Sequence, residues 1–152
     1  MSRQEQKIKD GAGPHLEPGE DVLVAVVAAP RGYTRSTASG TPSLGAGQQR
    51  RAHGAAEEAG LKLEGPMALA LTPRRLLTLR IGTPIGLGIG GSVKELLSAV
   101  SLDEVDAIEV KRIALRQNIR LTVRGSAIEL EANAGASAKE LAEAFGRARQ
   151  RA

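Results

Sequence analysis

The clearest alternation of hydrophobic and polar residues lies over positions 119–123 and 128–131. In both segments every second residue is apolar, which is typical of a strand with one buried face. Between them lies Gly125-Ser126, and a glycine at the first position suits a tight two-residue turn. The two segments therefore predict an antiparallel hairpin.

Side-chain pairing on both faces agrees with this hairpin. The turn at Gly125-Ser126 places Leu121 opposite Leu130 on the apolar face. On the other face it places Arg120 opposite Glu131, so that opposite charges pair across the strands. One register thus satisfies the turn chemistry, the apolar pairing and the charge pairing together.

Other short apolar runs, bounded by glycine or proline, predict further strands. The first is a β-branched run that ends before Pro30. Two later runs are joined by residues 72–75, where proline occupies the second position of a four-residue turn, so they form a second hairpin. The predicted strands cover residues 22–27, 67–71, 76–81 and 106–113.

The chain ends in a predicted helix over residues 137–150. Ser137 and Glu140 form the pattern of a capping box, in which each side chain accepts from the backbone N–H of the other residue. Apolar residues then recur at helical spacing. Phe145, the single phenylalanine, is expected to pack into one end of the sheet.

The order of the predicted elements defines the fold class. Strands follow one another through short turns without crossover helices between them, which excludes a parallel α/β fold. What remains is a mainly β protein with one C-terminal helix (α+β). We expect a bent antiparallel sheet or partly open barrel that is capped by helix 137–150.

Three stretches differ in composition, and they set the expected domain limits. Residues 1–16 are polar, contain glycine and proline, and predict a flexible tail. Residues 17–150 are expected to form a single domain. Within it, residues 31–65 make a long connection, and a connection of this length is either functional or disordered.

This connection divides into two parts. Residues 33–47 hold too little apolar area to offset the entropy of ordering them, so we expect them to be mobile. Residues 48–60 are expected to form a short helix only if its alanines find a surface to pack on. Leu61 and Leu63 would then anchor its end to the sheet. The alanines concerned are Ala52, Ala55, Ala56 and Ala59.

Composition narrows the possible functions. The 152 residues include no cysteine, which excludes disulfides and thiolate chemistry. Aromatic residues make up only 1% of the chain, so a base-stacking platform for nucleic acid is not expected. The N-terminal residues lack the apolar run of a signal peptide, and no stretch is apolar for long enough to span a membrane. We therefore expect a cytoplasmic protein.

No group of residues predicts catalysis or a cofactor. Residues 86–91 match G-x-G-x-x-G, but segment 92–100 is too short for the helix that a dinucleotide-binding fold requires there. His15 and His53 have no second histidine or carboxylate at metal-ligand spacing. We therefore expect no enzyme, no cofactor and no metal site.

Three short segments, taken in order, resemble bacterial pleckstrin-homology-like (PH-like) domains. Leu69–Leu77 reads LALTPRRLL and is similar to the "LALTxxRLL" hairpin of that family. Leu16–Glu20 resembles its "LxPGE" start, and Ser101–Val105 resembles the "PLxDI" segment before a later strand, with serine in place of proline. The resemblance covers about residues 16–150. It implies a seven-stranded curved sheet with a capping helix, used as a binding scaffold rather than as an enzyme.

The absence of catalytic groups and this resemblance favour a non-enzymatic interaction module that binds an unidentified protein or peptide. Such sheets offer an edge strand and a helix–sheet groove for peptide addition. The alternative is peripheral binding to an anionic membrane through a basic loop face. Nucleic acid is not expected as a partner, and the oligomeric state is left open. The candidate contact residues are Arg31, Arg35, Arg50, Arg51, Arg74, Arg75, Ile85 and Leu87.

Overall fold

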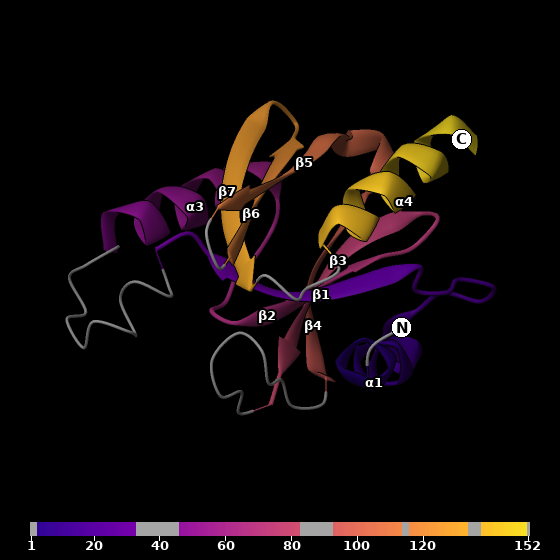
Figure 1. The fold of residues 1–152 in the computed structure, drawn as a ribbon. Coiled ribbons are helices and arrows are strands. Elements are labelled where there is room, and N and C mark those ends of the chain that lie inside the picture. The colour runs from indigo at the N-terminus through magenta and orange to yellow at the C-terminus, as the bar shows by residue number, and fades with distance from the viewer. Residues whose placement is uncertain (1–2, 33–45, 83–92, 114–115, 134–137, 152) are drawn as a thin grey trace.

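One antiparallel sheet forms the body of the fold in the computed structural model (Figure 1). The structure describes residues 3–32, 46–82, 93–113, 116–133 and 138–151. Within these residues the sheet has seven strands, in the order β4-β3-β2-β1-β7-β6-β5. They are β1 (Val24–Pro30), β2 (Met67–Leu71), β3 (Arg75–Ile81), β4 (Val93–Ser101), β5 (Val105–Ile113), β6 (Arg116–Val123) and β7 (Ser126–Asn133).

The sheet divides into a β1–β4 half and a β5–β7 half. Among the described residues, the strands of the two halves pair where the end of β1 meets β7, at Ala29 with Glu131 and at Pro30 with Leu130. Beyond this junction the β5–β7 strands diverge from β1, so the sheet is bent and open (Figure 1). The edge strands are β4 and β5. The predicted fold class, a bent antiparallel sheet with a C-terminal helix, is confirmed.

Three α-helices in the described part of the chain pack against this sheet: α1 (Arg3–Ala12), α3 (Ala46–Ala59) and α4 (Ala138–Arg151). The chain also forms two short 3-10 turns, η1 (Gly13–His15) and η2 (Leu102–Glu104). Helix α4 contacts β1, β2 and β5, α3 lies along β7, and α1 lies on β1 and β4. The predicted C-terminal helix is therefore present, although Ser137 of its expected capping box lies outside the described residues.

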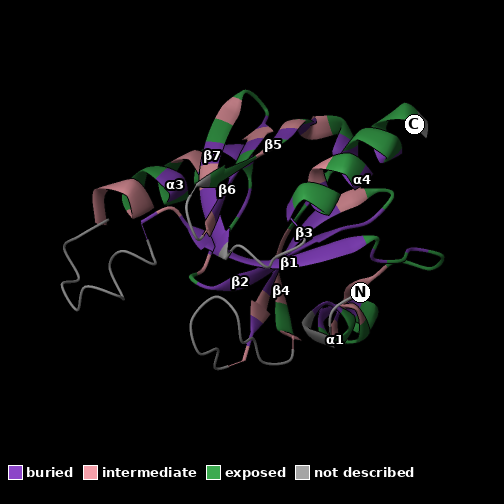
Figure 2. Cartoon of the chain, viewed as in Figure 1, coloured by how far each residue is buried: buried purple, intermediate pink, exposed green. Residues whose placement is uncertain are grey.

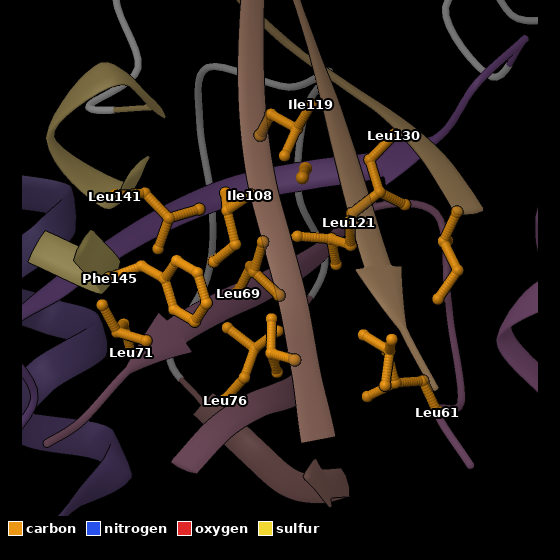
Figure 3. Close-up of a cluster of buried hydrophobic side chains, with 14 of the residues drawn as sticks. Leu61, Leu69, Leu71, Leu76, Ile108, Ile119, Leu121, Leu130, Leu141 and Phe145 are labelled. Carbon is orange, nitrogen blue, oxygen red and sulfur yellow. The ribbon is translucent and has the colours of Figure 1, made fainter. Parts of the chain in front are cut away.

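The main core lies between the two halves of the sheet and beneath helices α3 and α4. Figure 3 shows leucines of β2 and β3 meeting side chains of β5, β6 and β7 there, with the ring of Phe145 among them. Phe145 is 7% exposed, which confirms its predicted place in the core. Aliphatic side chains form nearly all of this core, as the scarcity of aromatic residues requires.

A second apolar cluster covers the opposite face of the β1–β4 half. It contains Leu77 and Leu79 of β3 and alternate residues of β1 and β2. Helix α1 closes this face with Ile8 and Ala12, both buried. Figure 2 shows β1 and β2 buried along their length between the two layers.

Helix α1 lies where the sequence predicts a flexible tail, and that expectation is wrong for residues 3–12. Its attachment rests on few groups. Ile8 packs into the second cluster, and the buried carboxylate of Glu5 accepts a hydrogen bond from the N–H of Ala25 at 3.1 Å. Because only Ile8 and Ala12 are apolar and buried, the hydrophobic pattern of this helix is too weak to predict it.

Helix α3 confirms the conditional prediction for residues 48–60. Ala52, Ala56 and Ala59 are buried on the surface that the prediction requires. Leu61 and Leu63 follow the helix and are buried in the main core. The expected mobility of residues 33–47 falls mostly outside the described residues, which resume at position 46.

The hairpin at 116–133 is confirmed as an element, but its predicted register is wrong by two residues. Leu121 lies opposite Ile128, and Arg120 lies opposite Glu129. The turn is Arg124-Gly125, and both residues have positive φ, at 50° and 82°. Two positive φ values are what a type I′ turn requires, so Arg124 takes a conformation that sequence reasoning reserves for glycine. A shift of two residues keeps every side chain on its predicted face.

The remaining strands differ from the predictions mainly in their limits. Strand β1 begins and ends later than the predicted 22–27, and β5 begins one residue before the predicted 106–113. Strand β4 is not predicted at all. It pairs with β3 through two register shifts, so its burial does not alternate and the sequence shows no period of two.

Candidate functional site

Two clefts lie next to each other on the outer side of the β5–β7 half. The first, of about 360 Å³, opens on the outer face of the three strands. The second, of about 190 Å³, lies between this face and helix α3. Arg31 and Glu129 line both clefts, so the two clefts adjoin, and together they are here called the α3 groove. Its other polar lining residues are Gln48, Arg51, Glu109, Lys111, Asn118 and Arg120.

Strand alternation turns a row of charged side chains into this groove. Ile108, Leu121 and Ile128 point inward to the core, so their neighbours along each strand point outward. Register then places Glu109 opposite Arg120 and Arg120 opposite Glu129. The result is a row of alternating charge across β5, β6 and β7.

Arg120 and Glu129 form the ion pair at the centre of this row. The Nε of Arg120 lies 2.8 Å from the Oε1 of Glu129. This hydrogen bond, aided by the charge of Glu109, raises the pKa of Arg120 above its ordinary value. The charge of Glu129 is therefore largely balanced by Arg120 within the groove.

Asn118 forms part of the groove floor and lies two positions before Arg120 on the same face of β6. It lies between Lys111 of β5 and Glu131 of β7 and is only 9% exposed. Its Oδ1 has no hydrogen-bond partner among the described residues. A buried amide oxygen without a partner is uncommon in folded proteins, because burying it costs free energy that no bond returns.

Three cations of the groove have no carboxylate within ion-pair distance in the described ranges: Arg31, Arg51 and Lys111. Arg31 is held in place by its backbone, because its N–H donates to the carbonyl of Glu129 at 3.0 Å and extends the ladder between β1 and β7. Arg51 precedes the buried Ala52 on α3 and is exposed. Lys111 is an exposed residue of the edge strand β5.

The structure brings together two of the predicted contact residues, Arg31 and Arg51. Arg50 is exposed on the same helix but is not among the residues that line the groove. Arg35, Ile85 and Leu87 lie outside the described residues, as does the glycine motif at 86–91.

Arg74 and Arg75 lie far from the groove. They belong to the β2–β3 turn, which is next to the start of β1, whereas Arg31 follows its end. Strand β1 has seven residues, so these positions are separated by about 20 Å along the strand. The structure therefore does not bring Arg31 and Arg51 together with Arg74 and Arg75 on one basic face.

The arginines of this turn also form ion pairs with carboxylates. Arg75 donates to both oxygens of the buried Glu20, at 2.6 Å and 3.0 Å, and Glu20 also accepts from the hydroxyl of Thr72 at 2.6 Å. These bonds, that to Arg75 above all, lower the pKa of Glu20 to about 2 despite its burial. Arg74 lies 3.9 Å from Glu17. This cluster fastens residues 17–20 to the β2–β3 turn.

Sequence reasoning missed Glu109, Lys111, Asn118, Arg120 and Glu129 as site residues. Their alternation predicts that they face outward, which is correct, but charged outward residues are ordinary on any solvated strand. The groove exists because α3 lies beside β7, and nothing in the sequence places these segments together.

Histidine and carboxylate side chains of the described residues do not cluster in the way that metal ligands do. No group of three or more His, Asp or Glu side chains in these ranges could hold a metal ion. His53 is exposed on α3, and His15 is partly exposed with its carbonyl bonded to Arg75. No helix in the described ranges is long and apolar enough to cross a membrane.

Comparison with solved structures finds similar bacterial proteins. One is a DUF1696 family protein with a pleckstrin-homology domain from Shewanella loihica, with a TM-score of 0.46 and 12% identity, covering 91% of this chain and 89% of the other. Another is a pleckstrin-homology domain from Shewanella amazonensis, with a TM-score of 0.45 and 12% identity, covering 91% of both chains. Both carry the domain type that the sequence motifs resemble. No protein-family profile and no curated protein sequence matches the chain.

Proposed function

We propose that this chain is a non-enzymatic interaction module that binds a protein or peptide partner in the α3 groove and acts in the cytoplasm. The observation that carries the proposal is the groove itself. It is a concave, polar surface between α3 and the outer face of β5–β7, and it contains three cations and a buried amide oxygen that the described residues leave without partners.

The adjoining edge of the sheet supports the same function. Strand β5 ends the strand order, so one side of its backbone has no neighbouring strand among the described residues. At its start the carbonyl of Val105 accepts a hydrogen bond from Arg149 of α4, which leaves later residues of the strand as the accessible part. Exposed edge strands pair readily with extended segments of other chains.

Selection from a displayed library of random peptides tests this function. We expect enrichment of peptides that bind with micromolar affinity and whose binding is weakened by Arg51→Glu in the groove. The matched control is Arg50→Glu, which makes the same charge change one position away and should leave binding intact. Enrichment that is insensitive to both variants, or no enrichment at all, would contradict the proposal.

The membrane alternative makes a different prediction. Among the described residues Leu23 is the exposed large hydrophobic side chain, and it lies at the start of β1, away from the groove. Together with the separation of Arg74 and Arg75 from Arg31, this favours a peptide over a bilayer. Flotation with vesicles that contain anionic lipid checks the choice, and we expect no co-flotation at physiological salt.

A further inference from the structure

The charges of the α3 groove specify the chemistry of its partner, provided that the proposed function is correct. Four cations and two carboxylates line the two clefts. Arg120 and Glu129 form an ion pair with each other. Arg31, Arg51 and Lys111 have no ion-pair partner in the described ranges. The surplus is positive, so a complementary ligand must supply negative charge.

The floor of the groove gives a second and independent indication of the ligand's chemistry. Asn118 lines the first cleft, and its Oδ1 is buried without a donor among the described residues. A ligand N–H group that reaches this oxygen would supply the hydrogen bond that the described residues leave unmade. A peptide backbone carries such a group at nearly every residue, whereas inorganic phosphate carries none.

The spacing of the free cations points to several separate anionic groups. Lys111 lies on β5 and Arg31 lies beyond β7, so their backbones are about three strand spacings, or about 14 Å, apart. Arg51 lies farther on, on α3. No single phosphate spans this distance, whereas an extended peptide of about eight residues does.

We propose that the α3 groove binds an extended acidic peptide segment, whose carboxylates pair with Arg31, Arg51 and Lys111 and whose backbone N–H donates to Oδ1 of Asn118. The segment crosses the outer face of β5–β7 from the edge strand to α3. Glu109 and Glu129 lie between the cations and disfavour a continuous negative surface. They therefore favour a segment whose acidic residues alternate with uncharged ones.

Fluorescence anisotropy with three labelled peptides of about eight residues tests this proposal. The peptides share one backbone and carry glutamate, lysine or serine at alternate positions. We expect the glutamate peptide to bind at least about tenfold more tightly than the other two, and its affinity to fall as salt is raised. Arg51→Glu should weaken it by about tenfold, whereas Arg50→Glu, with the same change in net charge, should change it less than about twofold.

Asn118→Leu separates a binding role from a structural one. We expect the affinity of the variant for the glutamate peptide to fall about fivefold, which corresponds to the typical net contribution of one hydrogen bond. Its thermal stability should not fall. A structural asparagine would show the opposite result, a loss of stability with affinity unchanged.

Three results would overturn the proposal. The first is equal binding of all three peptides. The second is equal loss of affinity in Arg50→Glu and Arg51→Glu. The third is complete displacement of the glutamate peptide by inorganic phosphate or by anionic vesicles at matched charge, which would make the site a general anion or membrane site. If neutral peptides from the library still bind in the groove, the acidic specificity fails while the proposed function stands.

Discussion

Both halves of the sheet consist of antiparallel strands, but their outer faces differ in polarity. The β1–β4 half is apolar on both sides, with the main core on one and the second cluster under α1 on the other. The β5–β7 half is apolar only on its inner side, and its outer side carries the charged α3 groove. A face covered by the chain itself serves stability, whereas the polar, uncovered face is available to a partner.

The residue patterns of the individual strands already show this difference. Met67–Leu71 of β2 is apolar at every position and buried at every position, as in a sheet covered on both sides. The second half of β6, residues 119–123, alternates, with Arg120 exposed between the buried Ile119 and Leu121. Outer-face substitutions should therefore have very different effects in the two halves.

The largest expected effect is on the outer face of β3. Leu77 is fully buried in the second cluster, so Leu77→Ala should lower the free energy of unfolding by about 3 kcal/mol through lost burial and a cavity. Glu109→Ala, on the outer face of β5, is the matched control and should change it by less than about 0.5 kcal/mol. Urea denaturation measures both values. Similar losses in the two variants would remove the distinction between the halves.

The next effect concerns the ion pair that fastens residues 17–20 to the β1–β4 half. The folded pKa of Glu20 lies near 2, below its ordinary value of 4.5, so its stabilisation is complete above pH 4.5 and is lost as the pH falls toward 2. The difference corresponds to on the order of 3 kcal/mol. Unfolding followed by circular dichroism between pH 6 and about pH 2.5 checks this loss.

Glu20→Gln is the comparison for that titration. Gln cannot ionise, and the variant leaves Arg75 without its buried carboxylate, so it should be less stable than the wild type at neutral pH. Its stability should also change less between pH 4.5 and pH 2. Parallel pH profiles in the two proteins would show that Glu20 is not the group that titrates.

A smaller effect of opposite sign is expected in the β5–β7 half. Asn118→Leu removes a buried oxygen without a partner and keeps the branched shape and the number of heavy atoms, so it should raise the free energy of unfolding by about 1 kcal/mol. Thermal denaturation of the variant and the wild type checks the sign. Clear destabilisation would mean that Asn118 holds the sheet together.

The smallest effect tests the corrected register. Arg120 and Glu129 are partly exposed, so their coupling is weak but favourable. A double-mutant cycle with alanine at both positions should detect this coupling. The same cycle between Arg120 and Glu131 should give a smaller coupling, because Glu131 lies opposite Asn118 and pairs with Arg116. The reverse result would restore the register with Gly125-Ser126 as the turn.

Sequence patterns predicted elements that carry strong local signals. The β2–β3 hairpin has apolar runs around Pro73, and α4 has apolar residues at helical spacing, so both are found. Helix α1 is held by Ile8, Ala12 and Glu5, which leave little periodicity to detect. The register at Arg124 was mispredicted because a non-glycine residue occupies a positive-φ position of the turn.

The candidate site was harder to predict because it depends on distant segments meeting. Charge makes Arg31 and Arg51 candidates in the sequence, and the structure places both in the groove. Arg74 and Arg75 were chosen on the same ground, but Glu17 and Glu20 occupy them through contacts that only the fold brings about. Charge in a sequence identifies candidates, and pairing in the fold decides which remain free.

The proposed contact surface is tested most directly by a map of backbone amide chemical shifts during titration with the glutamate peptide. We expect the largest changes on Arg31, Lys111, Asn118 and residues 48–52 of α3, along both clefts of the α3 groove. Changes centred instead on α1, or on the β2–β3 turn with Arg74 and Arg75, would contradict the claim that the outer face of the β5–β7 half is the contact surface.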